Sequence, residues 1–192
     1  MKQSLWVILF YTLFFSGCSV VSFYPFFTSD KVVEHSNIVG NWTSHSVNHF
    51  NGLEWKFTNE KSNSKYQLSI WKDNVVWAKY EVTFFEIDDT LFADLFLKKH
   101  ERLKTGCEHL VEMHTVAKVI VKKGIYEFIG LSRDWLQKEL SRRPHLLKHI
   151  QSENRLLITA NSRQLSRFLK RIAHNPDAFV SKQKITLLKI ES

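Results

Sequence analysis

The sequence predicts a mainly β domain whose antiparallel strands curl or close into a barrel, with two short helices inserted late. Three observations lead to this fold class. Apolar and polar residues alternate with a period of two in several runs between residues 40 and 131, which is typical of half-buried antiparallel strands. Short segments rich in Asn, Asp and Gly separate these runs and supply turn chemistry. After residue 131 the apolar spacing becomes that of helices.

We expect seven to nine short strands. A sheet of that size tends to curl, and closing it into a barrel removes its exposed edges. The first strand is expected at Gly40, and the others cover residues 53–58, 65–70, 78–84, 91–96, 111–121, 125–131, 155–160 and 184–190.

Two helices are expected near residues 133–143 and 162–173. Ser132 can cap the first helix, whose apolar residues share one side. Asn161 and Gln164 have the spacing of a capping box at the start of the second, and its apolar residues follow the i, i+3, i+4, i+7 pattern of an amphipathic helix.

The first eighteen residues have the features of an export signal. Lys2 precedes an uncharged apolar run from Leu5 to Phe15, which is shorter than the roughly 17–25 residues that a membrane-spanning helix needs. The residues Phe15-Ser16-Gly17-Cys18 resemble the lipobox of bacterial lipoproteins. That resemblance implies that the thiol of Cys18 receives a diacylglycerol, that residues 1–17 are removed, and that the new terminus gains an acyl chain such as palmitate.

An uncleaved signal anchor over residues 5–27 is the alternative, although small residues and Pro25 interrupt it. With cleavage, residues 18–37 form the lipidated cysteine and a tether, and residues 38–192 form one domain. Both interpretations place the domain outside the cytoplasm. In Gram-negative lipoproteins, a serine such as Ser19 after the cysteine favours the outer membrane over the inner one, with the domain facing the periplasm.

The predicted tether carries an aromatic cluster that either packs on the domain or extends from it. Its members surround Pro25 and are Phe23, Tyr24, Phe26 and Phe27.

Two further resemblances bear on the fold. Gly40-Asn41-Trp42 resembles the Gly-x-Trp signature of lipocalins and related calycin barrels, in which the tryptophan plugs the barrel floor. The chain also resembles a group of uncharacterised bacterial envelope lipoproteins that share Tyr24 to Thr28, the Gly-x-Trp residues and an aspartate-bearing strand such as Leu91 to Leu95. This second resemblance implies a lipid-anchored barrel and brings no activity with it.

The chain is basic, with a formal net charge of +8 and a pI near 9.5. For an exported protein the acidic neighbours are lipid head groups, lipopolysaccharide phosphates or glycan carboxylates rather than nucleic acid. A basic, soluble surface with no particular partner is the simpler alternative. If Cys18 is acylated, Cys107 is the one remaining thiol, so no intramolecular disulfide forms.

Trp42, Asp94 and His114 are the three candidate ligand-binding residues. Asp94 lies between two phenylalanines in an apolar strand, so it either points into a ligand-binding cavity or is a structural carboxylate paired with a lysine or with backbone donors. His114 could join Cys107 and His109 around zinc, but the spacing matches no zinc motif. We therefore expect no metal and no cofactor.

A further helical turn is expected around Leu146 and Leu147. It would place His145 and His149, four residues apart, on one turn. No carboxylate follows at the distance that a metal-binding helix requires, so an exposed basic edge is the simpler interpretation.

No nucleophile elbow, phosphate-binding loop or Ser-x-x-Lys sequence is present, so the sequence predicts no catalysis. We expect a lipid-anchored envelope protein that binds an apolar or amphipathic small ligand in its barrel. The alternative is a non-catalytic scaffold or assembly factor that contacts another envelope component.

Overall fold

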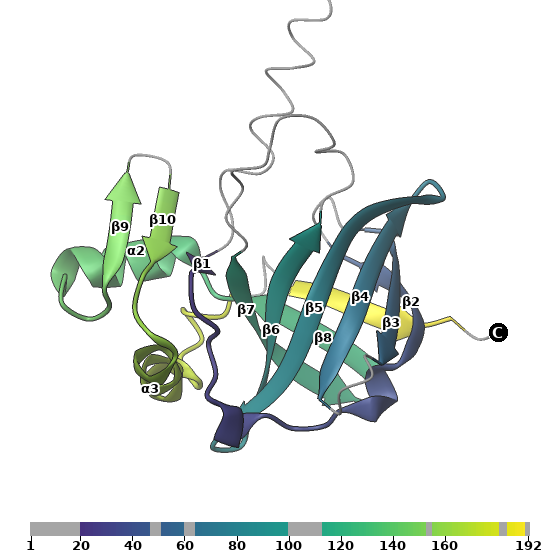
Figure 1. Cartoon of the computed structure of the whole chain (residues 1–192), viewed down its shortest axis with the longest axis horizontal. Helices are drawn as coiled ribbons and strands as arrows, with labels where there is room; N and C mark the ends of the chain where they lie inside the picture. The colour runs from purple at the N-terminus through teal and green to yellow at the C-terminus, as the bar shows by residue number, and fades with distance from the viewer. Residues whose placement is uncertain are drawn as a thin grey trace, which may run out of the picture.

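The computed structural model describes residues 20–46, 51–59, 64–99, 113–152, 155–180 and 184–190. Eight antiparallel strands close into a barrel, and a smaller layer of strands and helices lies against one side of it (Figure 1). The predicted fold class is therefore confirmed. The barrel strands are β2 (Gly40–His45), β3 (Glu54–Asn59), β4 (Lys65–Lys72), β5 (Val75–Ile87), β6 (Thr90–Lys99), β7 (His114–Lys122), β8 (Ile125–Gly130) and β11 (Lys184–Lys189).

The strands follow the order β6-β5-β4-β3-β2-β11-β8-β7, and pairing of β6 with β7 closes the ring. Tight turns join neighbours along the chain. Asp73 and Asn74, which link β4 to β5, both have positive φ angles of 50° and 61°, as the two-residue turns of hairpins require. Lys123 and Gly124, which link β7 to β8, have the same geometry with φ angles of 50° and 78°.

The smaller layer extends the sheet from β7 in the order β7-β1-β10-β9. Strand β1 pairs with β10 in parallel, unlike every barrel pair. Ser132 and the Asn161–Gln164 capping box begin the two helices as predicted. The elements of this layer are β1 (Val21–Ser22), α2 (Arg133–Arg142), β9 (His149–Ser152), β10 (Arg155–Ile158) and α3 (Ser162–Ile172).

Residues 20–39, here called the strap, lead from β1 to the barrel. They run down beside the barrel and cross beneath it to β2 (Figure 1), through the 3₁₀ helices η1 (Ser29–Lys31) and η2 (Ser36–Ile38). Phe26 is buried and Tyr24 is exposed. The described part of the predicted tether is therefore packed on the domain, largely through one side of its aromatic cluster.

The barrel wall separates two apolar cores. The interior core is rich in aromatic rings and comprises Ile38, Trp42, Leu53, Trp55, Phe57, Tyr66, Leu68, Ile70, Val82, Phe84, Ala93, Ala117, Val119, Tyr126, Phe128 and Leu187. The outer core lies between the wall and the smaller layer. It joins Phe26 of the strap to Phe85 and Phe92 of the wall and to the apolar sides of both helices.

Two expectations are wrong. One concerns a helical turn after residue 143, and the other concerns the number of strands, one of which lies before residue 40. Leu146 and Leu147 lie in a turn before β9 rather than in a helix, because Leu147 is buried in the outer core and the chain then pairs with β10. The sheet has eleven strands rather than seven to nine, since β1 and β9 are too short to show a period of two. Within the described residues, no helix is long and apolar enough to span a bilayer.

We predict that Trp42→Ala lowers the free energy of unfolding by about 3–5 kcal/mol, because it removes a fully packed ring from the interior core. Urea denaturation followed by fluorescence measures this loss. Tyr24→Ala is the matched control, because its ring is 48% exposed and surface substitutions usually change stability by about 0.5 kcal/mol or less. Equal losses in the two variants would contradict the packing described above.

Candidate functional site

The most strongly coupled polar residues lie where the strap crosses the outer wall of the barrel. Asp94 of β6 is 2% exposed. Its Oδ1 lies 2.6 Å from Nδ1 of His114 on β7, and its Oδ2 accepts a 2.9 Å hydrogen bond from the backbone N–H of Phe26. One carboxylate thus holds together the two strands that close the barrel and the strap.

Asp94 faces outward rather than into the barrel. Phe92, two residues earlier on the same face of β6, belongs to the outer core, whereas Ala93 belongs to the interior core. Of the two alternatives predicted for Asp94, a cavity-facing carboxylate and a structural one, the structure therefore shows the structural carboxylate. Its partners are a histidine and a backbone donor rather than a lysine.

A row of charged and aromatic side chains continues from His114 along the same outer face. The ring of Phe96 stacks on that of His114 at 4.6 Å, and Nζ of Lys98 lies 5.0 Å from the Phe96 ring centre. Glu81 follows, and it forms ion pairs with Lys98 at 2.9 Å and with Lys65 at 2.6 Å. These contacts fix the orientation of the His114 ring toward Asp94.

Burial raises the pKa of the Asp94 carboxyl, while its bonds to His114 and to the Phe26 N–H act in the opposite direction. A buried carboxylate is costly unless donors surround it. The arrangement therefore depends on His114, because the Phe26 N–H reaches only one of the two oxygens.

Ser22 of β1 completes a set of residue types found in hydrolases. It is in register with His114, so serine, histidine and aspartate occupy three neighbouring strands, as nucleophile, base and orienting acid do in catalytic triads. Ser22 is fully buried, however, and its Oγ accepts the backbone N–H of Tyr24 at 3.2 Å. The Ser22 hydroxyl thus bonds within the strap, and the cluster attaches the strap to the barrel wall.

Trp42 lies on the opposite side of the wall, in the interior core. Its Nε1–H donates to the Ile38 carbonyl at 2.7 Å, its ring meets Tyr126 edge-on at 5.0 Å, and Nζ of Lys189 lies 5.7 Å from its ring centre. The structure brings Asp94 and His114 together and places Trp42 apart from them, so the three predicted ligand-binding residues do not form one site.

A second polar cluster closes the barrel floor. The backbone N–H of His35 donates to the Tyr66 hydroxyl at 2.7 Å, and Nε2 of His35 lies 3.0 Å from the Tyr126 hydroxyl. Burial lowers the pKa of His35 and raises the pKa values of Tyr66 and Tyr126, which favours uncharged groups at neutral pH. The cluster fixes the last turn of the strap beneath the interior core.

Sequence reasoning missed the roles of Ser22, Phe26 and His35. Ser22 and Phe26 act through partners more than 60 residues away along the chain, and no local pattern marks such pairs. The predicted helical pair of His145 and His149 is wrong, because the chain turns between them and His149 begins β9.

Three other predicted residues, Cys18, Cys107 and His109, lie outside the described residues. In the part of the chain that the structure describes, no three His, Cys, Asp or Glu side chains lie close enough to share a metal ion.

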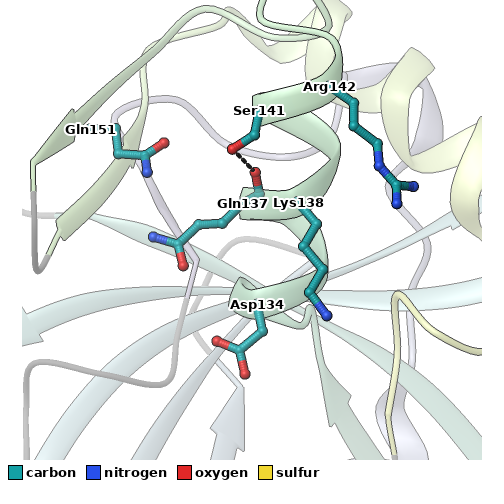
Figure 2. A pocket seen from close by; sticks show the side chains of 6 residues that line it. All are labelled: Asp134, Gln137, Lys138, Ser141, Arg142 and Gln151. Carbon is teal, nitrogen blue, oxygen red and sulfur yellow. Dashed lines mark hydrogen bonds between the residues drawn. The ribbon is translucent and has the colours of Figure 1, made fainter.

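Open hollows lie on the surface of the described residues, and two of them are formed by strands and helices named above. One, of about 470 Å³, lies over β2, β3 and β4. The other, of about 570 Å³, lies between α2 and β9. Figure 2 shows Gln151 projecting from β9 toward the turns of α2 that carry Gln137 and Ser141. The second hollow is lined by polar side chains, namely Asp134, Gln137, Lys138, Ser141, Arg142 and Gln151.

Comparisons with known proteins identify no relatives. No family model matches the chain, and no curated protein or solved structure has significant similarity to it.

We predict that His114→Ala destabilises the fold by about 3 kcal/mol at pH 7.5, because it leaves a buried carboxylate with one donor. Burial raises the pKa of Asp94, so the folded state binds the proton more tightly than the unfolded state. Protonation of Asp94 therefore stabilises the fold; this contribution is present below the ordinary pKa of an aspartate and is lost as pH rises through the raised pKa. Removing His114 raises that pKa further, so the variant's deficit should shrink at pH 5.

Urea titrations at the two pH values measure the deficit. The matched control is His149→Ala, since Nδ1 of His149 lies 2.8 Å from the Leu147 carbonyl, a backbone group that does not titrate. We expect its deficit to be about 1 kcal/mol and to change little between the two pH values. A His114→Ala deficit that stays constant with pH would show that Asp94 does not carry the effect.

Proposed function

We propose that this chain is a lipid-anchored protein of the bacterial envelope that binds another envelope component through its outer surface, with the barrel as a rigid core and without catalysis. The packed barrel interior carries this proposal. Sixteen interior residues are each at most 7% exposed, and their rings contact one another across the barrel. A small-ligand carrier needs an apolar cavity of several hundred cubic ångströms, and side chains occupy that space here.

The position of the strap determines how the proposed anchor would hold the domain. Val20 is 1% exposed, and β1 begins at Val21. Ser19 alone separates Cys18 from this packed segment. Two residue steps span at most about 7 Å, so an acylated Cys18 would hold the β1 side of the domain directly against the bilayer.

A small ligand remains the second proposal, and one observation favours it. The indole N–H of Trp55 is buried in the interior core and has no hydrogen-bond acceptor among the described residues. An unsatisfied buried donor costs about 1–3 kcal/mol. A molecule that brings an acceptor to this N–H would remove that cost.

Photo-cross-linking in intact cells tests the surface-binding proposal. A photoreactive amino acid replaces one exposed apolar residue at a time: Val75 of β5, Val121 of β7 or Ile150 of β9, which are 54%, 42% and 60% exposed. We expect a reproducible adduct of one mass from at least one position and none from another. Adducts at no position, together with a bound molecule in native mass spectrometry of the delipidated protein, would favour the small-ligand proposal instead.

Acylation is tested separately. We expect mass spectrometry of the mature N-terminal peptide to show a lipid on Cys18, because multiple acyl chains are needed for stable anchoring. Cys18→Ala should move the protein from the membrane fraction to the soluble or the unprocessed fraction, while Cys107→Ala, the matched control, should leave it in the membrane fraction. A mature chain that begins at another residue would contradict the proposed anchor.

A further inference from the structure

Strand β9 has an unpaired edge among the described residues, because the sheet order ends with it. The backbone N–H of Phe23 donates to the Ile158 carbonyl at 3.2 Å, so the backbone groups of Ile158 point toward β1. Backbone groups alternate in direction along a strand, so Leu157 points toward its partner Ile150 on β9.

The same alternation shows which groups of β9 are available. Ile150 uses its N–H and C=O in the ladder with β10, so those of His149 and Gln151 point away from β10. The 2.8 Å bond from the Thr159 N–H to the Lys148 carbonyl agrees with this register. Such outward-facing groups are a template for another strand. Proteins often block such edges with Pro or Lys, and β9 contains neither.

The two sides of this edge differ in chemistry. Gln151 is opposite Leu156, which belongs to the outer core with α2, so Gln151 faces the helix and lines the hollow of Figure 2. Ile150 is opposite Leu157, so it lies on the other side, where it is 60% exposed. In a strand added to β9, every second side chain would lie over the polar hollow, and the side chains between them would lie beside Ile150.

Charge determines what the hollow accepts. Lys138 and Arg142 are its two cations, and Asp134 is its one carboxylate. Asp134 lies in the first turn of α2 and Arg142 at its last residue, about 12 Å apart along the axis. Glu139 lies beside this end as well, where its Oε1 is 3.8 Å from Nη1 of Arg142 and its other oxygen pairs with Arg143. The cations there still outnumber the carboxylates, so the end beside Lys138 and Arg142 favours an acidic side chain.

We propose that β9 binds an extended segment of a partner protein in which acidic and apolar residues alternate. The segment adds a strand to the sheet, its carboxylates meet Lys138 and Arg142, and its apolar residues pack beside Ile150. A second copy of the chain fits less well, because β9 would offer His149 and Gln151 to the hollow and no carboxylate. This inference rests on the proposed surface-binding function and assigns its location.

The test uses the full-length chain in detergent and a fluorescent eight-residue peptide that alternates valine and glutamate. We expect saturable binding by anisotropy, about tenfold tighter than that of a valine–lysine peptide at low salt. Gln151→Pro removes an outward N–H without touching the β10 ladder and should weaken binding about tenfold or more. Gln151→Ala, which keeps the N–H, should stay within about twofold.

The double substitution K138E/R142E leaves the backbone unchanged and should reverse the preference toward the lysine peptide. Absence of saturable binding, equal affinity for both peptides, or full affinity in Gln151→Pro would overturn the proposal. Self-association that Gln151→Pro abolishes, without peptide binding, would overturn it in favour of a second copy. Cellular adducts from Val75 or Val121 that persist in Gln151→Pro would show that surface binding holds and that the β9 location alone is wrong.

Discussion

A single buried carboxylate, that of Asp94, joins three parts of the chain that are far apart in sequence. It bonds to His114 on the neighbouring barrel strand and to the backbone N–H of Phe26 in the strap. Closure of the barrel and attachment of the N-terminal segment therefore depend on one group. A buried carboxylate that loses a donor costs several kcal/mol. The two bonds of Asp94 therefore strongly favour the state in which the strap is packed against the barrel.

The barrel wall carries apolar side chains on both of its sides, and the strap covers part of the outer side. Phe85 and Phe92 point outward from the wall, and Phe26 of the strap covers them together with the helical layer. The barrel wall thus lies between an aromatic interior core and an apolar outer core. Such a wall has little freedom to expand around a ligand, which supports the proposed binding through the outer surface.

Most of the fold follows from local patterns. Periods of two and of 3.6 locate the barrel strands and both helices, and Asn161 with Gln164 fixes the start of α3. Patterns of this kind cannot locate β1, because a two-residue strand shows no period. They also cannot locate β9, since His149 to Ser152 follow no clear alternation and are strand only because β10 lies beside them. The candidate site was predictable only in part: an aspartate in an apolar strand marked Asp94, but nothing local marked Phe26 or Ser22 as neighbours.

The pairing of β1 has a consequence for how the protein matures. Val21 pairs with Leu157, and Trp42 pairs with Lys189, so neither of the first two strands can be completed until the last part of the chain has emerged. Folds dominated by such distant pairings form slowly. In the proposed export of this chain, β1 would therefore stay without its β10 partner until residues 155–158 had crossed the membrane, and the adjoining N-terminal residues would be open to the proposed processing for that time.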